Sequence, residues 1–196
     1  MISAIILAAG SSTRMGSPKM LLPWGDNTII GQVIETLKYA GIHEILVVTG
    51  SDRIAVQHAI EHYDVKTVFN SLYKEGDMLI SIQTGLRNLR NNISAALIVL
   101  GDQPQLKSSV VTRITKAYNE SLSPLIVPSF EMRRGHPWII ERSLWQRFLQ
   151  MKPDQKPRDF LNKFSQKIYY IPLEDDSILR DIDTQQEYKK ELSKLN

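Results

Sequence analysis

Short apolar runs rich in β-branched residues alternate along the chain with segments whose apolar residues recur every three or four positions. The runs have the length and composition of buried strands, and the spacing of the other segments is typical of amphipathic helices. Strands and helices are therefore expected in alternation through the first two thirds of the chain. The expected strands cover 4–7, 44–49, 65–69, 95–100 and 125–127, and the expected helices cover 29–40, 54–62, 78–89 and 110–118.

The borders of these segments support the same interpretation. Thr28 can cap the first helix, and Gly41 stands where its C-terminal cap belongs. The uninterrupted apolar run at 95–100 is typical of a central parallel strand covered on both faces. The sequence thus predicts an α/β fold with a doubly wound, mostly parallel, Rossmann-like sheet. Such sheets bind ligands at the carboxyl ends of their strands, where the segment 10–19, Asn70 and Asp102 would meet.

A loop of small and hydroxyl-bearing residues follows the first strand and contains two cations, Arg14 and Lys19. Backbone N–H groups in such a loop can approach an anion closely, and two cations suggest an anion with several charges, such as a nucleoside triphosphate. Five residues separate Gly10 from Gly16, so the loop is not a P-loop, and the dinucleotide fingerprint G-x-G-x-x-G is absent. The alternative is an ordinary turn with solvated charges.

Acidic residues follow the central strand and recur near the end of the chain. Gly101-Asp-Gln-Pro104 directly follows the strand at 95–100. Asp102 is therefore placed at the end of that strand, where a carboxylate facing a phosphate loop could hold Mg²⁺; the alternative is a cap for the following helix. Asp181 and Asp183 share one side of an extended segment. Asp183 is a second candidate metal ligand, although Asp183 and Thr184 could instead begin the last helix.

One histidine is placed to face a substrate. His136 lies between Gly135 and Pro137, and this backbone could aim the imidazole at a ligand; the alternative is a surface turn. Proline residues punctuate this less regular second half, but no linker separates it, so a single domain over 1–196 is expected.

Composition narrows the function classes. The chain has no cysteine, which excludes disulfides, thiolate metal sites and a cysteine nucleophile. The net charge of +3 comes from scattered basic residues, so no nucleic-acid partner is expected. No apolar run approaches 18 residues and no signal-peptide pattern opens the chain, so we expect no membrane association and a cytoplasmic location.

Five motifs occur in the order Leu7-Ala-Ala-Gly-x-Ser-x-Arg-Met-Gly-x-x-Lys19, Leu-Leu-Pro, Gly-Asp-Gln-Pro, Gly-His-Pro and Asp-Ile-Asp-Thr. Together they resemble the nucleotidyltransferases that modify molybdenum cofactor, and most closely the cytidylyltransferase branch that includes accessory proteins of xanthine-dehydrogenase-type enzymes. The resemblance extends over essentially the whole chain. The guanylyltransferase branch usually has Leu-Ala-Gly-Gly in the first motif, so Ala8-Ala9-Gly10 favours CTP over GTP.

The resemblance implies a nucleotidyltransferase-type fold with a nucleotide-binding half at 1–105 and an acceptor-binding half at 106–196. It implies Mg²⁺-dependent transfer of CMP from CTP to the terminal phosphate of molybdopterin, with or without Mo, and transient docking to a recipient molybdenum hydroxylase such as xanthine dehydrogenase. Rival hypotheses are a GTP-dependent or sugar-phosphate nucleotidyltransferase and a non-catalytic cofactor chaperone. A chaperone would need an exposed docking patch; Trp138, Trp145 and Phe148 could form one, but core packing is favoured.

Residue roles follow from the same resemblance. Lys19, Arg14 and Asp102 are implied as catalytic, and Asp102 and Asp183 as metal ligands. The implied acceptor-binding residues are Gln103, Pro104, Gly135, His136 and Arg158, although Pro157 replaces the glycine that usually precedes that arginine. An extra residue at Asp77 leaves the register of Ser81 open. The implied nucleotide-binding residues are Leu7, Ala8, Ala9, Gly10, Ser11, Ser12, Arg14, Lys19, Asn70, Gly76, Ser81 and Gly101.

Overall fold

The computed structural model describes residues 1–10, 18–75 and 78–195 of the chain. Within these residues, eight strands form the central sheet and two more form a separate hairpin. The sheet contains β1 (Ile2–Ala8), β4 (Ile45–Thr49), β5 (Lys66–Phe69), β6 (Ala95–Leu100), β7 (Leu125–Phe130), β8 (Arg133–Arg134), β9 (Trp138–Glu141) and β10 (Ile168–Pro172), and the hairpin pairs β2 (Pro23–Trp24) with β3 (Asn27–Thr28).

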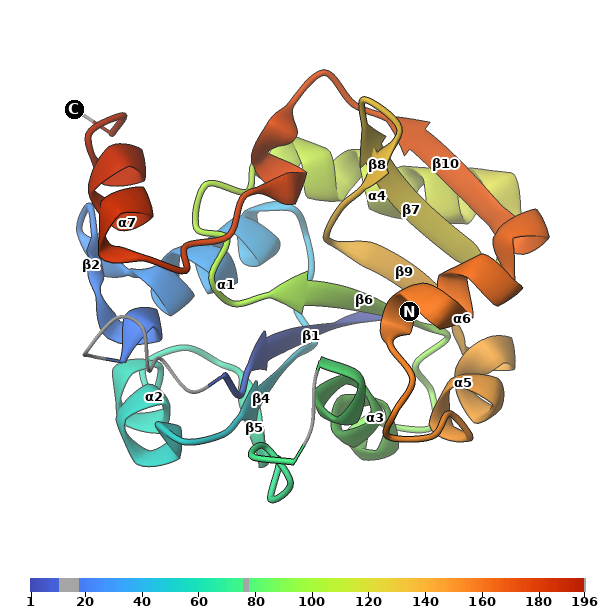
Figure 1. Ribbon diagram of the computed structural model, residues 1–196, viewed down its shortest axis with the longest axis horizontal. Helices are drawn as coiled ribbons and strands as arrows, with labels where there is room; N and C mark the ends of the chain where they lie inside the picture. Colours follow the sequence, from blue (N-terminus) through green and yellow to red (C-terminus); the bar gives the residue numbers. More distant parts are fainter. Residues whose placement is uncertain (11–17, 76–77, 196) are drawn as a thin grey trace.

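The sheet is mostly parallel. Its strand order is β10-β7-β9-β6-β1-β4-β5, and β8 pairs with β7 only (Figure 1). β1 lies between β6 and β4 and is parallel to both, with Ile5 opposite Ile98 on one side and Leu46 on the other. β9 is antiparallel to both of its neighbours, β6 and β7. The predicted α/β architecture is therefore confirmed, and the antiparallel β9 is an addition that no periodic pattern in the sequence predicted.

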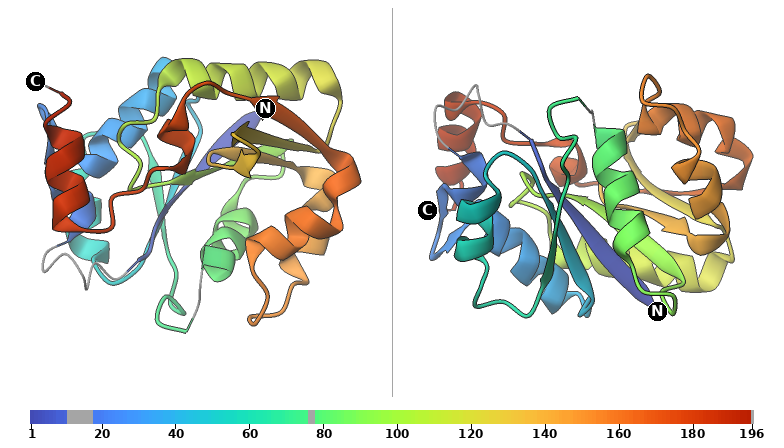
Figure 2. Two further views of the ribbon diagram at one scale, coloured as in Figure 1. Left: turned by 45° about the horizontal axis from the view of Figure 1, so that its top comes forward. Right: turned by 90° about the horizontal axis from the view of Figure 1, so that it is seen from below.

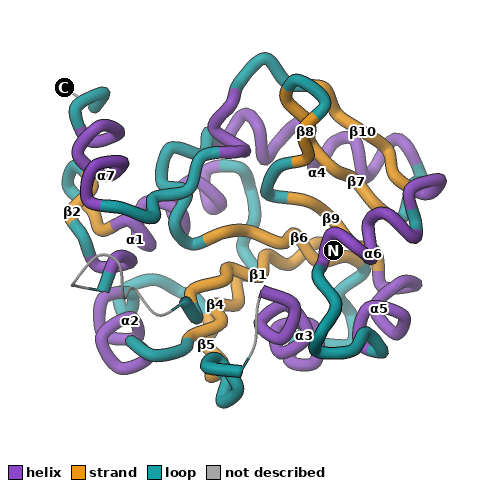
Figure 3. The backbone as a smooth tube through the Cα atoms, in the orientation of Figure 1, coloured by secondary structure: helices purple, strands orange, loops and turns teal. Residues whose placement is uncertain are grey.

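Helices cover both faces of this sheet (Figures 2 and 3). Successive residues of β1 face opposite sides: Ile6 packs in the core beneath α1 and α4, and Ile5 packs in the core beneath α3, α5 and α6. The helices are α1 (Ile29–Tyr39), α2 (Arg53–Ala59), α3 (Met78–Asn88), α4 (Ser108–Ser121), α5 (Arg142–Leu149), α6 (Pro157–Lys163) and α7 (Gln185–Leu192), and 3₁₀ turns cover Lys19–Leu21, Ser165–Lys167 and Asp176–Leu179.

The cap residues expected at the two ends of the first helix, Thr28 and Gly41, are where the helix begins and ends. Thr28 caps α1 by accepting a hydrogen bond from the backbone N–H of Gly31, and Gly41 follows the helix with a φ of +81°, as a C-terminal glycine cap requires. Trp138, Trp145 and Phe148 are buried in one core cluster, so the core interpretation of these residues is confirmed. Within the described ranges, no helix combines the length and apolarity needed to cross a membrane.

The C-terminal helix α7 packs against the hairpin β2–β3 near the start of the chain. In Figure 1, α7 lies beside β2. Trp24, Ile29 and Ile182 form a small buried cluster to which Tyr188 and Leu192 of α7 add contacts, and the Tyr188 hydroxyl donates a 2.6 Å hydrogen bond to the carbonyl of Pro23. The hairpin β2–β3 and the last helix therefore enclose the segment that leads into α7.

Parallel strands end together at one edge of the sheet. The backbone N–H of Gly101, just after β6, donates to the carbonyl of Leu7 near the end of β1 at 3.1 Å. A Cβ atom at Gly101 would lie 2.9 Å from that same oxygen, so only glycine allows the two strand ends to approach this closely. The ends of β1 and β6 therefore meet at one edge of the sheet, as expected for parallel strands.

Candidate functional site

An ammonium group stands between two carboxylates at this edge. Lys19 Nζ lies 2.6 Å from Asp102 Oδ2 and 2.7 Å from Asp183 Oδ1. The Lys19 side chain is almost fully buried, which by itself disfavours the charged form. The two carboxylates outweigh that burial, and the pKa of Lys19 is raised above its ordinary value. Lys19 is therefore a permanent cation at the carboxyl ends of β1 and β6.

Asp102 is held by main chain as well as by its side chain. Its carbonyl accepts a 3.0 Å hydrogen bond from the N–H of Ile182, which ties the end of β6 to a segment 80 residues later. The alternative role as a helix cap is wrong, because α4 begins after Lys107 and the Asp102 carboxylate faces Lys19 instead. This carboxylate therefore lies at the edge of the sheet, paired with Lys19.

A third carboxylate completes the cluster. Asp102, Asp181 and Asp183 each offer one oxygen, and the three oxygens lie within 4.8 Å of one another. Partial burial and the two neighbouring carboxylates raise the pKa of Asp181. Oxygen ligands at this spacing fit a hard divalent cation, which can draw them in to about 2.1 Å. Asp181 was not among the predicted metal ligands, although its place two residues before Asp183 on an extended segment was the signal that could have found it.

The start of α7 fixes the direction of Asp183. Thr184 is the N-cap: its hydroxyl accepts from the N–H of Glu187, and the Glu187 carboxylate accepts from the N–H of Thr184 in return. The same carboxylate also accepts from the N–H of Asp183 at 3.0 Å. Thr184 thus takes the capping role, and the Asp183 side chain is left to face Lys19.

A cavity of about 240 Å³ opens beside this cluster. Six of the predicted site residues line it, and with them stand an aromatic ring and three apolar side chains that the sequence did not single out. The predicted residues in the lining are Leu7, Ala9, Gly10, Lys19, Ser81 and Asp102, and the others are Met20, Tyr73, Met78 and Leu100. Ala8 is not in the lining, because its side chain points to the opposite face of the sheet and packs in the core there.

Asn70 and Ser81 support one wall of this cavity. The Asn70 side-chain amide donates a buried 3.1 Å hydrogen bond to the Ser81 hydroxyl, and its Oδ1 accepts from the N–H of Leu72. The two residues therefore meet despite the extra residue at position 77 that left the register of Ser81 open. Four further residues of the predicted nucleotide site, Ser11, Ser12, Arg14 and Gly76, lie outside the described residues.

Three of the predicted acceptor-binding residues converge on Ile178. The His136 N–H donates to the Ile178 carbonyl at 2.9 Å, and the Gln103 side-chain amide reaches the same oxygen at 3.5 Å. Gly135 lies so close that a Cβ atom there would be 2.5 Å from this oxygen. Among the described residues, Gln103 Oε1 and His136 Nε2 are buried without a hydrogen-bond partner.

The other two acceptor predictions are placed differently. Pro104 lines a separate, larger cavity beside α7. Arg158 is exposed in the first turn of α6, and no hydrogen bond or ion pair within the described parts of the chain links it to Lys19 or to Asp102. The structure therefore groups Gln103, Gly135 and His136, and it leaves Arg158 apart from them.

The burial of His136 should make the free energy of unfolding depend on pH. Burial lowers the pKa of His136 from 6.5 to about 4, so in the folded state the neutral imidazole persists while the unfolded chain already binds a proton. The free energy of unfolding should therefore fall as the pH drops from about 6.5 toward 4. His136→Asn should flatten that slope in chemical denaturation at a series of pH values. The matched replacement of exposed His62 should leave it unchanged, and equal slopes in wild type and His136→Asn would contradict the prediction.

Comparison with known proteins places this chain among nucleotidyltransferase relatives. The sequence profile of the MobA-like NTP transferase domain matches residues 4–168. A protein named nicotine blue oxidoreductase from Paenarthrobacter nicotinovorans is 28% identical over 93% of this chain and 92% of its own. The molybdenum cofactor cytidylyltransferase of Escherichia coli is 26% identical over 95% of this chain and 93% of its own.

Solved structures share the fold. The crystal structure of Rv0371c from Mycobacterium tuberculosis superposes with a TM-score of 0.86, 23% identity and coverage of 98% of this chain and 97% of that one. A structure of the same protein described as a complex with manganese superposes with a TM-score of 0.82 at 22% identity, covering 98% of each chain. At this identity the likeness establishes the architecture of the sheet and its helices.

Proposed function

Because this chain belongs to the MobA-like NTP transferase family and is a nucleotidyltransferase, we propose that it transfers CMP from CTP to the terminal phosphate of molybdopterin. The observation that carries the proposal is the pairing of Lys19 with the carboxylates of Asp102 and Asp183 at the carboxyl edge of the sheet. Phosphoryl-type transfer relies on positioning and charge neutralisation, and a cation beside a metal-binding carboxylate cluster supplies both.

The donor nucleotide is assigned to the 240 Å³ cavity. The apolar Ala9 and the aromatic Tyr73 in its lining suit a base and ribose, and the ammonium of Lys19 suits the phosphates. The match to Ala8-Ala9-Gly10 rather than Leu-Ala-Gly-Gly supports CTP over GTP, and the relative from Escherichia coli named as a cytidylyltransferase agrees with this choice.

Asp102, Asp181 and Asp183 would hold Mg²⁺, since their three oxygens lie within 4.8 Å of one another, and a protein of the same fold is described as a complex with manganese. When bound, the ion would supply positive charge to the phosphates of the nucleotide. An oxygen of the acceptor phosphate would form a bond to the α-phosphorus of CTP while the bond to pyrophosphate breaks. Since a phosphate monoester is already largely ionised near neutral pH, the protein need not supply a base. Lys19 would neutralise charge on the α-phosphate as pyrophosphate leaves.

The acceptor is assigned to the region where Gln103, Gly135 and His136 converge on Ile178. Among the described residues, Gln103 Oε1 and His136 Nε2 are buried there without a hydrogen-bond partner, and they would pair with a polar ligand that reached them. A pterin offers several hydrogen-bonding edges, so the donors and acceptors of this region suit it. The product would be the cytosine dinucleotide form of the cofactor, delivered by transient docking to a molybdenum hydroxylase such as xanthine dehydrogenase.

Pyrophosphate release tests the proposal directly. The chain is incubated with CTP, GTP, ATP or UTP and Mg²⁺, with and without Mo-loaded molybdopterin. We expect release with CTP that depends on the cofactor. Release with GTP instead would make GTP the donor, as in a guanylyltransferase. Release that needs an added sugar phosphate in place of the cofactor would identify a sugar-phosphate nucleotidyltransferase.

A negative result would also be informative. Binding of the cofactor without pyrophosphate release would favour a non-catalytic carrier. Because one relative is named nicotine blue oxidoreductase, oxidation or reduction of nicotine blue is measured in parallel. Turnover in that assay and none with nucleotides would overturn the proposed transfer reaction.

A further inference from the structure

The extended segment 180–183 supplies two of the three clustered carboxylates. One of its sides faces the cluster and the other packs in an apolar core. Asp181 and Asp183 face Asp102 and Lys19, whereas Ile182 points the other way and is fully buried beside Trp24. The main chain of this segment is tied to the sheet through the hydrogen bond from the Ile182 N–H to the Asp102 carbonyl. The position of the two carboxylates therefore depends on what holds the segment at its ends.

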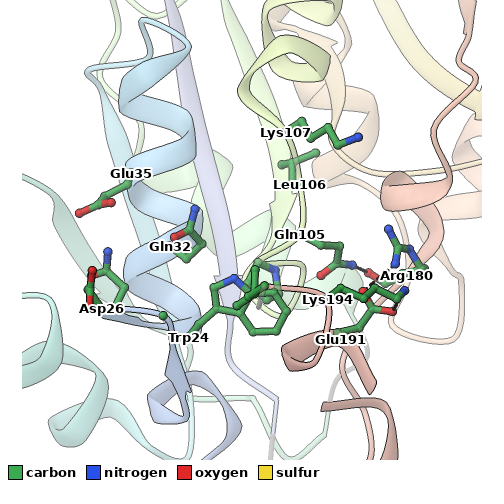
Figure 4. Close-up of a pocket in the computed structure, with 14 residues that line it drawn as sticks. Trp24, Asp26, Gln32, Glu35, Gln105, Leu106, Lys107, Arg180, Glu191 and Lys194 are labelled. Atoms are coloured by element: carbon green, nitrogen blue, oxygen red, sulfur yellow. Dashed lines mark hydrogen bonds and ion pairs between the residues drawn. The ribbon is translucent and has the colours of Figure 1, made fainter. Parts of the chain in front are cut away.

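Contacts of Arg180 hold the N-terminal end of the segment. The Arg180 carbonyl accepts a hydrogen bond from the side-chain amide of Gln105. Its guanidinium Nη1 donates to Glu191 Oε2 at 2.6 Å, and its Nε lies 3.2 Å from Asp176 Oδ1. Figure 4 shows Arg180, Gln105 and Glu191 together along one wall of a cavity of about 740 Å³ between α1 and α7.

Glu191 is an unusual residue for the inner face of a short helix. It is the buried residue of α7, with 8% of its surface exposed, in a helix whose other residues are half-buried or exposed. Its second oxygen, Oε1, takes a 2.6 Å contact from Lys194 Nζ. Burial opposes ionisation of this carboxyl, but the two cations outweigh it and the pKa of Glu191 is lowered.

A buried ion pair contributes little net stability compared with apolar packing, so docking of α7 alone does not account for it. An apolar side chain at position 191 would bury the same surface without desolvating a charge. What the ion pair adds is a fixed geometry, because a guanidinium held by a carboxylate has a defined place and orientation. That geometry is transmitted to residue 180, next to Asp181.

We infer that Glu191 is a positioning residue for the metal-binding carboxylates: by holding Arg180, it fixes the segment that presents Asp181 and Asp183 to Asp102. The inference rests on the proposed function in one respect, that this cluster binds a divalent cation. Residues that orient metal ligands without touching the ion commonly change metal affinity by about 10- to 100-fold when replaced. The C-terminal helix thereby contributes to the site although none of its residues lies in the carboxylate cluster.

The test replaces the charge of Glu191 and measures Mn²⁺ binding to the full chain. Free Mn²⁺ is followed by electron paramagnetic resonance without nucleotide. Glu191→Gln should weaken Mn²⁺ binding about tenfold. Arg180→Gln should weaken it at least as much, because it removes the same contact and also the one with Asp176. The double variant should bind no more weakly than Arg180→Gln alone.

Two controls separate positioning from simple loosening of α7. Lys194→Gln removes the other partner of Glu191 without touching Arg180, and Tyr188→Phe removes the hydrogen bond between α7 and Pro23. Both variants should bind Mn²⁺ as tightly as wild type. Wild-type affinity in Glu191→Gln, or an equal loss in Tyr188→Phe, would overturn the inference.

A metal-free measurement distinguishes failure of the inference from failure of the proposed function. Hydrogen exchange at the Ile182 amide, which donates to Asp102, should be about tenfold faster in Glu191→Gln than in wild type, because the opening free energy of this segment falls. Absence of Mn²⁺ binding to wild type would remove the metal role from the proposed function, and faster exchange would still support the positioning by Glu191. Unchanged exchange would overturn it.

Discussion

Asp102→Asn is expected to lower the rate of nucleotide-dependent pyrophosphate release at least about a hundredfold, by analogy with loss of a charge partner in a transition state. Asparagine keeps the volume of the side chain, and the backbone hydrogen bond from Ile182 to the carbonyl of residue 102 does not involve the side chain. The change therefore removes a negative charge from the cluster without removing the contact that joins β6 to the segment leading into α7.

The same variant should also bind Mn²⁺ more weakly, since one of three anionic oxygens is replaced by a neutral group. Turnover is measured with saturating CTP and acceptor, and Mn²⁺ binding is measured separately, so that a loss of metal can be told apart from a loss of alignment. Asp154→Asn, an isosteric change at an exposed loop position, serves as the matched control and should have wild-type values. Turnover of Asp102→Asn within threefold of wild type would remove Asp102 from the catalytic residues.

The first half of the fold could be predicted because its signals are local. β1, β4 and β6 are mostly apolar runs, and β5 is a short run with β-branched and aromatic residues. Both cap residues of α1 are recognisable in the sequence. Rules for parallel sheets then bring the ends of β1 and β6 together, which is why Lys19 and Asp102 could be expected at one edge. Such inferences need no knowledge of contacts between distant segments.

The second half could not be predicted in the same way. β9 inserts between β6 and β7 in the opposite direction, and its four residues, three of them apolar, contain nothing that fixes either neighbour or direction. Arg158 was assigned from a motif position, whereas contacts place Gln103 and His136 together through the Ile178 carbonyl. Pairing and convergence of this kind are decided by tertiary packing, which a single sequence does not display.

The large sequence separation of the site residues explains why Asp181 was not predicted as a metal ligand. Lys19 and Asp183 are 164 residues apart, and the strand period alone indicated only that Asp181 and Asp183 share a side. Their approach to Asp102 depends on Ile182 being buried under β2 and α7. The Arg180–Glu191 contact, which lies behind that segment, could not be read from either residue alone.

Lys19→Met should change catalysis and metal binding in opposite directions. Methionine keeps the unbranched, buried side chain but removes the charge that would neutralise the α-phosphate, so turnover should fall at least about a hundredfold. The ammonium of Lys19 also occupies the two carboxylates that a divalent cation would need, at 2.6 Å and 2.7 Å. Each such ion pair is worth about 1 kcal/mol even at the dielectric of water, so losing both should tighten Mn²⁺ binding about tenfold or more.

Lys107→Met is the matched control, because Lys107 is also paired with a carboxylate, that of Asp175, which does not belong to the cluster. Both its turnover and its Mn²⁺ affinity should stay close to wild type. If Lys19→Met binds Mn²⁺ with wild-type affinity or more weakly, the ion and the ammonium do not compete, and the cation binds elsewhere. Tighter binding together with lost turnover would mean that Lys19 balances the charge of Asp102 and Asp183 until the metal arrives, and is then released toward the phosphates of the nucleotide.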